Sequence, residues 1–319
     1  MKKKKIVHLL TSDKKSGGNV YERYLEHIDL DIKHEFLIDT NVKNRVKKLF
    51  YFYHSLYKIS KKEYEVTIRK SESCFFMNKH QKNIVIFHHY YPAPTNFLVN
   101  IFQRLAHRNL LRNLDKIDTL VVVSRYWQEY FKNIGFIQTK IIYNPFEIEE
   151  YLAYDSKRIE QFKIKYRLDK KPIVYIGNPQ KSKGADKTYE ALKDLDVHLV
   201  TSGAGELRLS VMNLNLNFQE YILLLQASSL SVLMSQIEEG WNRVAHESIL
   251  CQTPVIGSGR GGMGELLSES GQIVCGDFSS LKKIVEKSLD NKLEVSKEAL
   301  EYVKNFSLVK FHTEWKNIL

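Results

Sequence analysis

Residues 237–258 read IEEGWNRVAHESILCQTPVIGS, and two glutamates in this stretch, Glu239 and Glu247, are separated by seven residues. Gly240 and Asn242 are typical of a turn that leads into a helix. The pattern predicts that Glu239 ends a loop, that Asn242 caps a helix, and that Glu247 lies about one turn inside it. Helix starts present unpaired N–H groups and partial positive charge, which suit phosphate. A phosphate near residues 242–244, flanked by two carboxylates that bind hydroxyl groups, indicates a pocket for a sugar nucleotide.

Strand and helix signals alternate on both sides of this stretch. Apolar runs predict strands at residues 5–10, 34–39, 83–89, 118–124, 172–177, 197–202 and 229–235. Amphipathic or capped segments predict helices at residues 20–27, 43–62, 96–113, 124–136 and 306–318. Alternation of this kind predicts an α/β fold with two doubly wound halves. A chain of 319 residues makes two domains the natural expectation.

Composition places the chain among ordinary globular proteins, with 43% hydrophobic and 27% charged residues. No run of 18 apolar residues occurs, so no membrane span is expected. The start, MKKKKIVHLL, has a basic head but too short an apolar stretch for a signal peptide, and it reads better as a strand. The three cysteines, Cys74, Cys251 and Cys275, are widely spaced. That spacing argues against a disulfide framework and suits the cytoplasm.

The net charge of +11 is concentrated near the N-terminus, because residues 1–83 carry 19 Lys plus Arg and 10 Asp plus Glu, a net +9. Residues 43–62, KNRVKKLFYFYHSLYKISKK, mix lysines with aromatic residues on one expected helix. Two interpretations stay open. The helix packs its aromatic residues on the sheet, or it makes a peripheral contact with an anionic membrane surface. Binding of single-stranded nucleic acid, which uses similar residues, is not expected.

The stretch at residues 237–258 resembles the E-x7-E signature of the group 1 glycosyltransferases, which are retaining enzymes with the GT-B fold. The resemblance rests on nine matching positions: Glu239, Gly240, Trp241, Glu247, Cys251, Pro254, Val255, Ile256 and Ser258. The chain departs from the usual pattern at three positions, where Asn242, Arg243 and Val244 replace Gly-Leu-Pro. The resemblance implies two Rossmann-like domains that face each other across a cleft. It places an N-terminal, acceptor-side domain at residues 1–150, joined by a C-terminal helix at about 301–319, and a nucleotide-sugar domain at 151–300.

The resemblance also implies roles for residues of the second domain. Glu247 would bind the ribose hydroxyls, and Glu239 would face the donor sugar together with the glycine pair Gly261 and Gly262. The donor site would also include Gly240, Trp241, Asn242, Arg243 and Val244. The family has an arginine and a lysine that clamp the diphosphate after the first strand of this domain. Lys183 stands at the lysine position, but Asn178, which follows Gly177, stands at the arginine position. Arg243, at the expected helix start, is a candidate substitute for the missing arginine.

In the first domain the resemblance points to two features that face the cleft. Gly17 and Gly18 form a glycine loop between the first strand and the first helix, where a ligand can approach the backbone. His88 follows the strand at residues 83–89 and aligns with a histidine at the donor–acceptor cleft, with His89 at the next position. Which of the two histidines takes that role stays open. A zinc site is not expected, because no partner motif lies near the pair.

Residues 259–264 formally match the G-x-G-x-x-G fingerprint of dinucleotide-binding proteins, and Asp277 follows a later strand. The match comes late in the chain and before a short helix, whereas the fingerprint belongs after a first strand. In the group 1 family the same place reads G-G-x-x-E, here Gly261, Gly262 and Glu265. A nicotinamide cofactor is therefore not expected.

The resemblance implies a retaining, metal-independent hexosyltransferase that needs no cofactor and uses a nucleoside diphosphate sugar, by preference a UDP-sugar. The acceptor is expected to be a glycan, a lipid-linked molecule or a protein in the assembly of a bacterial surface glycan or glycoprotein. The sequence leaves the base, the sugar, the linkage and the oligomeric state open. Two alternatives also remain. They are a GT-B partner subunit without catalysis, which Asn178 would suit, and a sugar-nucleotide epimerase of similar fold.

Overall fold

The computed structural model describes residues 5–11, 20–38, 42, 44–91, 97–153 and 155–319. The chain divides into two units, Met1–Pro145 with Leu308–Leu319, and Phe146–Ser307. This division lies a few residues from the boundaries expected near 150 and 301. Phe146 belongs with the second unit because its backbone N–H donates to the Phe306 carbonyl at 2.9 Å and it forms a parallel bridge with Ser307.

The first unit is built on a parallel sheet with the strand order β2-β1-β3-β4-β5-β6. Its strands are β1 Ile6–Leu10, β2 Ile32–Phe36, β3 Val66–Lys70, β4 Lys82–Phe87, β5 Thr119–Val122 and β6 Thr139–Ile141. The first strands follow the 2-1-3-4-5 order of a doubly wound fold, whose ligands bind beyond the carboxyl ends of the strands. The reversal of strand order lies between β1 and β3.

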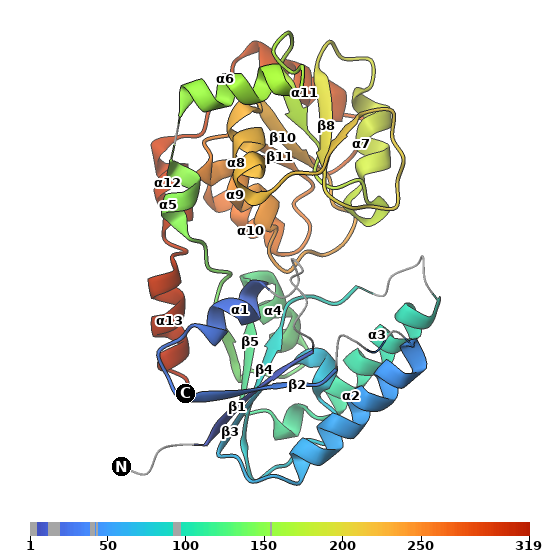
Figure 1. Cartoon of the computed structure of the whole chain (residues 1–319), viewed down its shortest axis with the longest axis vertical. Coiled ribbons are helices and arrows are strands. Elements are labelled where there is room, and N and C mark those ends of the chain that lie inside the picture. Colours follow the sequence, from blue (N-terminus) through green and yellow to red (C-terminus); the bar gives the residue numbers. More distant parts are fainter. Residues whose placement is uncertain (1–4, 12–19, 39–41, 43, 92–96, 154) are drawn as a thin grey trace. The chain divides into compact units, whose positions relative to one another are not determined.

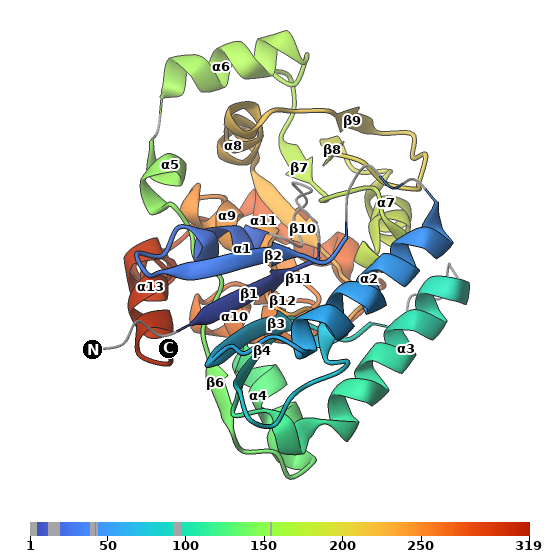
Figure 2. The same ribbon diagram turned by 60° about the horizontal axis from the view of Figure 1, so that its bottom comes forward.

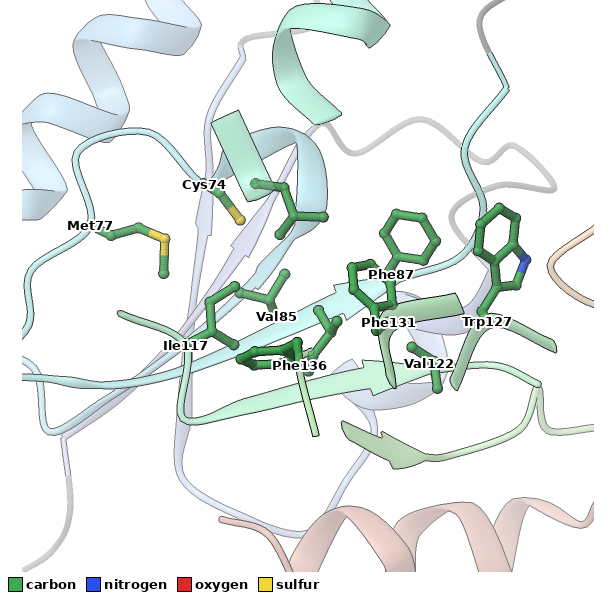
Figure 3. Packing of buried hydrophobic residues seen from close by; sticks show 11 residues of the cluster. Cys74, Met77, Val85, Phe87, Ile117, Val122, Trp127, Phe131 and Phe136 are labelled. Carbon is green, nitrogen blue, oxygen red and sulfur yellow. The ribbon is translucent and has the colours of Figure 1, made fainter. Parts of the chain in front are cut away.

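Helices cover both faces of this sheet: α1 Val20–Glu26, α2 Arg45–Ser60, α3 Phe97–Arg112, α4 Arg125–Asn133 and α13 Leu308–Lys316, with the 3-10 turns η2 Ser71–Ser73 and η3 Leu114–Lys116. One core packs α4 and α3 against β4 and β5, and Figure 3 shows Phe87 meeting Trp127 and Phe131. A second core packs Phe52 and Leu56 of α2 on β1. In both views α2 and α3 lie side by side (Figures 1 and 2).

The helix α13 returns to the first unit after the whole second unit has been traversed and lies beside α1 (Figures 1 and 2). Its Trp315 is fully buried and donates from Nε1 to the Tyr21 hydroxyl at 3.2 Å. Phe311 meets the same Tyr21 ring edge-on at 4.9 Å. The C-terminal helix is therefore an integral part of the first unit.

The second unit also holds a parallel sheet, with the order β12-β11-β10-β7-β8-β9. Its strands are β7 Ile173–Tyr175, β8 His198–Ser202, β9 Met212–Leu214, β10 Leu230–Leu233, β11 Val255–Gly257 and β12 Ile273–Val274. Read from β9, this is the 3-2-1-4-5-6 order of a Rossmann fold. The switch point, where a ligand crevice is expected, lies between β7 and β10.

The second unit has eight α-helices within its described residues: α5 Ile148–Leu152, α6 Ser156–Lys165, α7 Ala185–Leu192, α8 Phe218–Ala227, α9 Arg243–Leu250, α10 Gly262–Glu269, α11 Leu281–Asp290 and α12 Lys297–Lys304, besides the 3-10 turn η4 Lys181–Lys183. Its core gathers the inward side chains of β7, β10 and β11 with α7 and α11. Two parallel sheets flanked by helices confirm the α/β class with two doubly wound halves. None of the helices within the described ranges is long and apolar enough to cross a membrane.

Candidate active site

The switch point of the second unit brings two loops to one edge of the sheet. The loop after β7 contains Gly177, Asn178 and Lys183, and the loop after β10 contains Glu239 and Asn242. Because β7 and β10 are parallel neighbours, their carboxyl ends meet at this edge. Most residues predicted for the donor site therefore come together here.

Lys183 and Glu239 form an ion pair across these loops, with Lys183 Nζ 2.7 Å from Glu239 Oε1. The Glu239 side chain is 7% exposed and that of Lys183 is 35% exposed. Gly184 allows the close approach of the loops, because at its φ of +72° an added Cβ would lie 2.2 Å from the Met234 carbonyl oxygen. Glu239 is thus held in a buried position, while Lys183 reaches solvent.

The start of α9 has the geometry expected from the sequence. Asn242 is the N-cap, and its Oδ1 accepts from the Ala245 N–H at 2.9 Å. Its Nδ2 donates to Glu239 Oε1 at 3.4 Å. Glu239 therefore ends the loop, Asn242 caps the helix, and Glu247 lies in the second turn, while Gly240 and Val244 flank the cap.

The glycine pair after β11 contacts the backbone of Glu239 directly. Gly262 N–H donates to the Glu239 carbonyl at 2.8 Å, and Gly261 forms a parallel bridge with Glu239. Gly261 has a φ of +63°, and an added Cβ would lie 2.3 Å from the Glu239 carbonyl oxygen. The glycines of the G-x-G-x-x-G match serve local packing, because a Cβ at Gly259 would lie 2.7 Å from Val274 Cγ1 and one at Gly264 would lie 2.4 Å from the Gly259 carbonyl oxygen. Asp277 caps a turn by accepting from the Ser280 N–H at 2.8 Å.

Glu247 lies at the centre of a buried polar cluster. Its Oε2 accepts from the Tyr221 hydroxyl at 2.8 Å, and its Oε1 accepts from the Tyr151 hydroxyl at 3.3 Å. Arg243 Nη2 lies 3.3 Å from the same Oε1. Burial raises the pKa of Glu247 above its usual range, and Arg243 with the two tyrosine hydroxyls limits the rise. The carboxylate is held in one orientation before any ligand binds.

Arg243 lies at the helix start, as expected, but it has partners of its own. Besides the pair with Glu247, its guanidinium lies over the Phe146 ring at 4.3 Å from the centroid. An arginine has five N–H donors in a planar fork, a geometry that suits a phosphate. Asn178 lies in the turn after β7 against Gly203, whose added Cβ would lie 2.8 Å from its Nδ2.

Trp241 was predicted to bind the donor, but its side chain lies in the core. The indole is 5% exposed, and its Nε1–H donates to His246 Nδ1 at 3.2 Å. His246 Nε2 is 3.1 Å from the Val303 carbonyl, and its ring stacks on Phe146 at 3.8 Å. Burial holds the pKa of His246 well below its usual range, so the neutral ring accepts at Nδ1 and donates at Nε2. The indole therefore supports the loop after β10 from within the core.

In the first unit, His88 follows β4 and its Nε2 lies 3.0 Å from Glu22 Oε1. Lys70, the last residue of β3, reaches the same oxygen at 3.1 Å. His89 is exposed. Gly17 and Gly18, the predicted glycine loop, lie outside the described residues.

Sequence reasoning missed Glu22 and Lys70 here, as well as Tyr221 in the second unit. A signal was present for Glu22, which precedes the buried Leu25 by three residues and so falls beside the buried face of α1. Local sequence carries no such signal for Lys70 or Tyr221, whose partners are distant along the chain. Within the described ranges, no group of three or more His, Cys, Asp or Glu residues could hold a metal ion. The three cysteines are buried free thiols.

The second unit is similar to a family of known proteins. Residues 156–306 match the family described as "Glycosyl transferases group 1". An uncharacterized glycosyltransferase of Methanocaldococcus jannaschii is 28% identical over 149 residues, which are 42% of this chain and 42% of the relative. The curated relative is thus matched over less than half of its length.

Two solved structures show the likeness of fold. HepE of Anabaena in complex with UDP-glucose superposes with a TM-score of 0.77 at 18% identity, over 99% of each chain. Sucrose-phosphate synthase from Thermosynechococcus elongatus superposes with a TM-score of 0.76 at 16% identity, over 98% of each chain. The fold is therefore GT-B, as the resemblance implied. Residues 156–306, which make up most of the second unit, are similar to the glycosyltransferases of group 1.

Proposed function

We propose that the chain is a retaining hexosyltransferase, which moves a hexose or an N-acetylhexosamine from a nucleoside diphosphate sugar to an acceptor hydroxyl. The observation that carries the proposal is the pairing of Lys183 with Glu239 beside the start of α9, at the carboxyl end of β7 and β10. A phosphate and the hydroxyls of a sugar are the ligands that such a group of charges and helix N–H groups recognises. HepE of Anabaena, which has the same fold, was solved with UDP-glucose, and this favours UDP as the nucleotide.

The site supplies positive charge where the leaving group develops negative charge. When the bond between the sugar and the diphosphate breaks, the diphosphate becomes more negative, and Lys183, Arg243 and the α9 N–H groups would stabilise it. An ammonium has three N–H donors, so Lys183 can hold Glu239 and a phosphate oxygen together. These cations would take the place of a metal ion, so the reaction is expected to be metal-independent. The acceptor oxygen would attack from the face that the diphosphate leaves, which retains the anomeric configuration.

Glu247 and Glu239 have separate roles in this proposal. Glu247, held by two tyrosine hydroxyls and Arg243, would accept hydrogen bonds from the ribose hydroxyls. Glu239 would orient the donor sugar, because its backbone is fixed by the glycine pair of the next loop. No cofactor is needed for this chemistry.

A donor panel tests the proposal. We would measure the melting temperature with UDP-, GDP-, ADP- and dTDP-sugars, with and without EDTA, because a ligand that binds the folded state raises it. A rise with one nucleotide class, unchanged by EDTA, is expected. NMR coupling constants of the transferred sugar would then show whether its anomeric configuration is retained.

The other outcomes would overturn the proposal. An inverted product would contradict retention, and a shift abolished by EDTA would contradict metal independence. Conversion of the free sugar nucleotide without an acceptor would indicate an epimerase. Absence of binding to every donor would favour a partner subunit without catalysis.

We also infer a setting for the reaction, the cytoplasmic assembly of a bacterial surface glycan or glycoprotein on a glycan, lipid-linked or protein acceptor. Support comes from the surface of the first unit. The helices α2 and α3 contain no Asp or Glu, and both carry Lys or Arg. On α2, Val46 is 76% and Phe50 66% exposed, and on α3 Phe97 is 76% exposed. Exposed apolar side chains beside basic ones suit the surface of an anionic bilayer.

Vesicle flotation tests the membrane contact. The protein is expected to float with vesicles that contain phosphatidylglycerol and to stay behind with phosphatidylcholine alone. Replacing Phe50 by Ser should reduce flotation. Replacing Ile137 by Ser is the matched control, because Ile137 is 73% exposed and lies elsewhere in the same unit. Equal flotation of both variants, or binding to both kinds of vesicle, would contradict the proposed surface.

A further inference from the structure

A buried carboxylate joins three elements at the carboxyl edge of the first sheet. Glu22 lies on α1, Lys70 ends β3, and His88 follows β4, the neighbour of β3. Glu22 Oε1 lies 3.0 Å from His88 Nε2 and 3.1 Å from Lys70 Nζ. The Glu22 side chain is 1% exposed, whereas His88 is 23% exposed. The carboxylate is therefore hidden, and the imidazole that it binds can be reached from solvent.

The carboxyl group of Glu22 is ionised. Burial opposes ionisation, but the charges of His88 and Lys70 outweigh it and lower the pKa of Glu22 to about 2. An ionised carboxylate can only accept hydrogen bonds. Two of its neighbours stay uncharged. Burial lowers the pKa of His8 on β1 to about 3, so this ring adds no positive charge, and burial raises the pKa of Tyr21 well above its usual range, so this hydroxyl adds no negative charge.

This contact sets the tautomer of His88. Because Glu22 only accepts, Nε2 must carry the hydrogen that the two share. In the neutral ring Nδ1 then holds a lone pair and accepts hydrogen bonds. The other tautomer would present an N–H at Nδ1 and would select a carbonyl or phosphate oxygen instead.

A second contact fixes the ring plane. The edge of Tyr21 meets the His88 ring at 5.0 Å with an interplanar angle of 82°. The Tyr21 hydroxyl donates to the Ile142 carbonyl at 3.2 Å and accepts from Trp315 Nε1 at 3.2 Å. Tyr21 and Glu22, which are consecutive residues of α1, thus hold His88 from two sides. Trp315 of the C-terminal helix α13 in turn holds Tyr21 in place.

We propose that Glu22 is a positioning residue that makes Nδ1 of His88 a hydrogen-bond acceptor for a substrate hydroxyl. The chemistry suits the proposed function, on which the inference rests, because sugars and their acceptors present hydroxyl donors. Glu22 Oε2 is buried and has no partner within the described residues, so Oε1 alone makes the contacts described above. The ammonium group of Lys70 balances the negative charge of the Glu22 carboxylate. It therefore keeps the carboxylate ionised when the His88 ring is neutral.

The first test reads the tautomer and does not depend on activity. In protein labelled with 15N-histidine, at a pH where the ring is neutral, the His88 signals are expected to show hydrogen on Nε2. Glu22→Gln should change this, because a glutamine amide can also donate to Nε2 and so allow hydrogen on Nδ1. Hydrogen on Nδ1 in the unaltered protein would overturn the inference, even if every variant failed to fold.

The second test separates positioning from folding. Glu22→Gln is expected to lower kcat about 100-fold, with the affinity for UDP unchanged, because the residues proposed to bind the donor lie in the other unit. Glu26→Gln, one turn further along α1, removes the same charge and should leave kcat unchanged. Equal kcat for the two variants would overturn the inference. Failure of the proposed function would look different, since the unaltered protein would then transfer no sugar while the tautomer could still be read.

Discussion

The buried carboxylates of the two units are held by two kinds of contact, one between residues close together in the sequence and one between residues that meet only through the fold. The placement of Glu239, Asn242 and Glu247 depends on a turn and a cap, which are local properties. The contact of Tyr221 with Glu247 and that of Lys70 with Glu22 depend on strand order and register. The burial of the Trp241 indole could not be predicted, because a motif gives the identity of an aromatic residue but not the direction of its side chain.

Arg243 gives a prediction for the donor site. Arg243→Ala should raise the donor KM about tenfold or more, because a hydrogen bond to a charged group is worth roughly 1.5–3 kcal/mol. Steady-state kinetics with a saturating acceptor would measure this. Arg260→Ala is the control, since Arg260 is 53% exposed and pairs at the surface with Glu238. An unchanged donor KM in Arg243→Ala would show that Arg243 does not replace the arginine missing at position 178.

Glu22 gives a prediction for acid stability. Its pKa is held at about 2 in the folded protein, below the ordinary value of 4.5. The ionised carboxylate therefore stabilises the fold above about pH 4.5, and this contribution is lost as the pH falls toward 2. The shift corresponds to about 3 kcal/mol. Urea unfolding at pH 5 and pH 3 should show a smaller loss of stability in Glu22→Gln than in Glu26→Gln.

Among the elements, strands with long apolar runs were predicted to within a few residues. Residues 83–89 were expected and β4 spans Lys82–Phe87. The strand β3, Val66–Lys70, was missed because its sequence, VTIRK, ends in two charged residues. Arg69 is nevertheless 3% exposed, and its Nη1 donates to the Ser73 carbonyl at 3.2 Å. A buried arginine whose Nη1 donates to backbone carbonyls leaves no signal in hydrophobic periodicity.

The helix α13 gives a prediction at this scale. Trp315→Ala should lower the free energy of unfolding of the first unit by about 3–5 kcal/mol, because it removes a large buried side chain and leaves a cavity. The affinity for UDP should stay the same. Val309→Ala on the same helix is the control, because Val309 is 76% exposed and its loss should cost less than about 0.5 kcal/mol. Urea unfolding would compare the variants, and equal stability would contradict the assigned role of α13.

For the whole molecule, two doubly wound halves could be predicted from length and from the alternation of elements. The boundary could be predicted only to within several residues, because its position depends on the pairing of Phe146 with Phe306 and Ser307, far away in sequence. The returning segment begins at Leu308, since the preceding helix α12 contacts α9 of the second unit. Hydrophobic patterns mark helices but do not tell which core each helix joins.

Two units with separate cores predict two thermal transitions. UDP at 100 times its dissociation constant should stabilise only the unit that binds it, by about 2.7 kcal/mol. Differential scanning calorimetry of the whole chain would show one transition moving upward, while Trp315→Ala should move the other downward. A single transition that responds to both changes would contradict independent unfolding.

The return of α13 has a consequence for synthesis on the ribosome. The first unit is translated early, but the helix that buries Tyr21 leaves the ribosome only after all of residues 146–307 have been made. The second unit, although translated later, is continuous in the chain and can finish folding first. Until α13 docks, the nascent first unit exposes the apolar surface that Trp315 and Phe311 will cover. This protein is thus expected to depend on chaperones for longer than its order of translation would suggest.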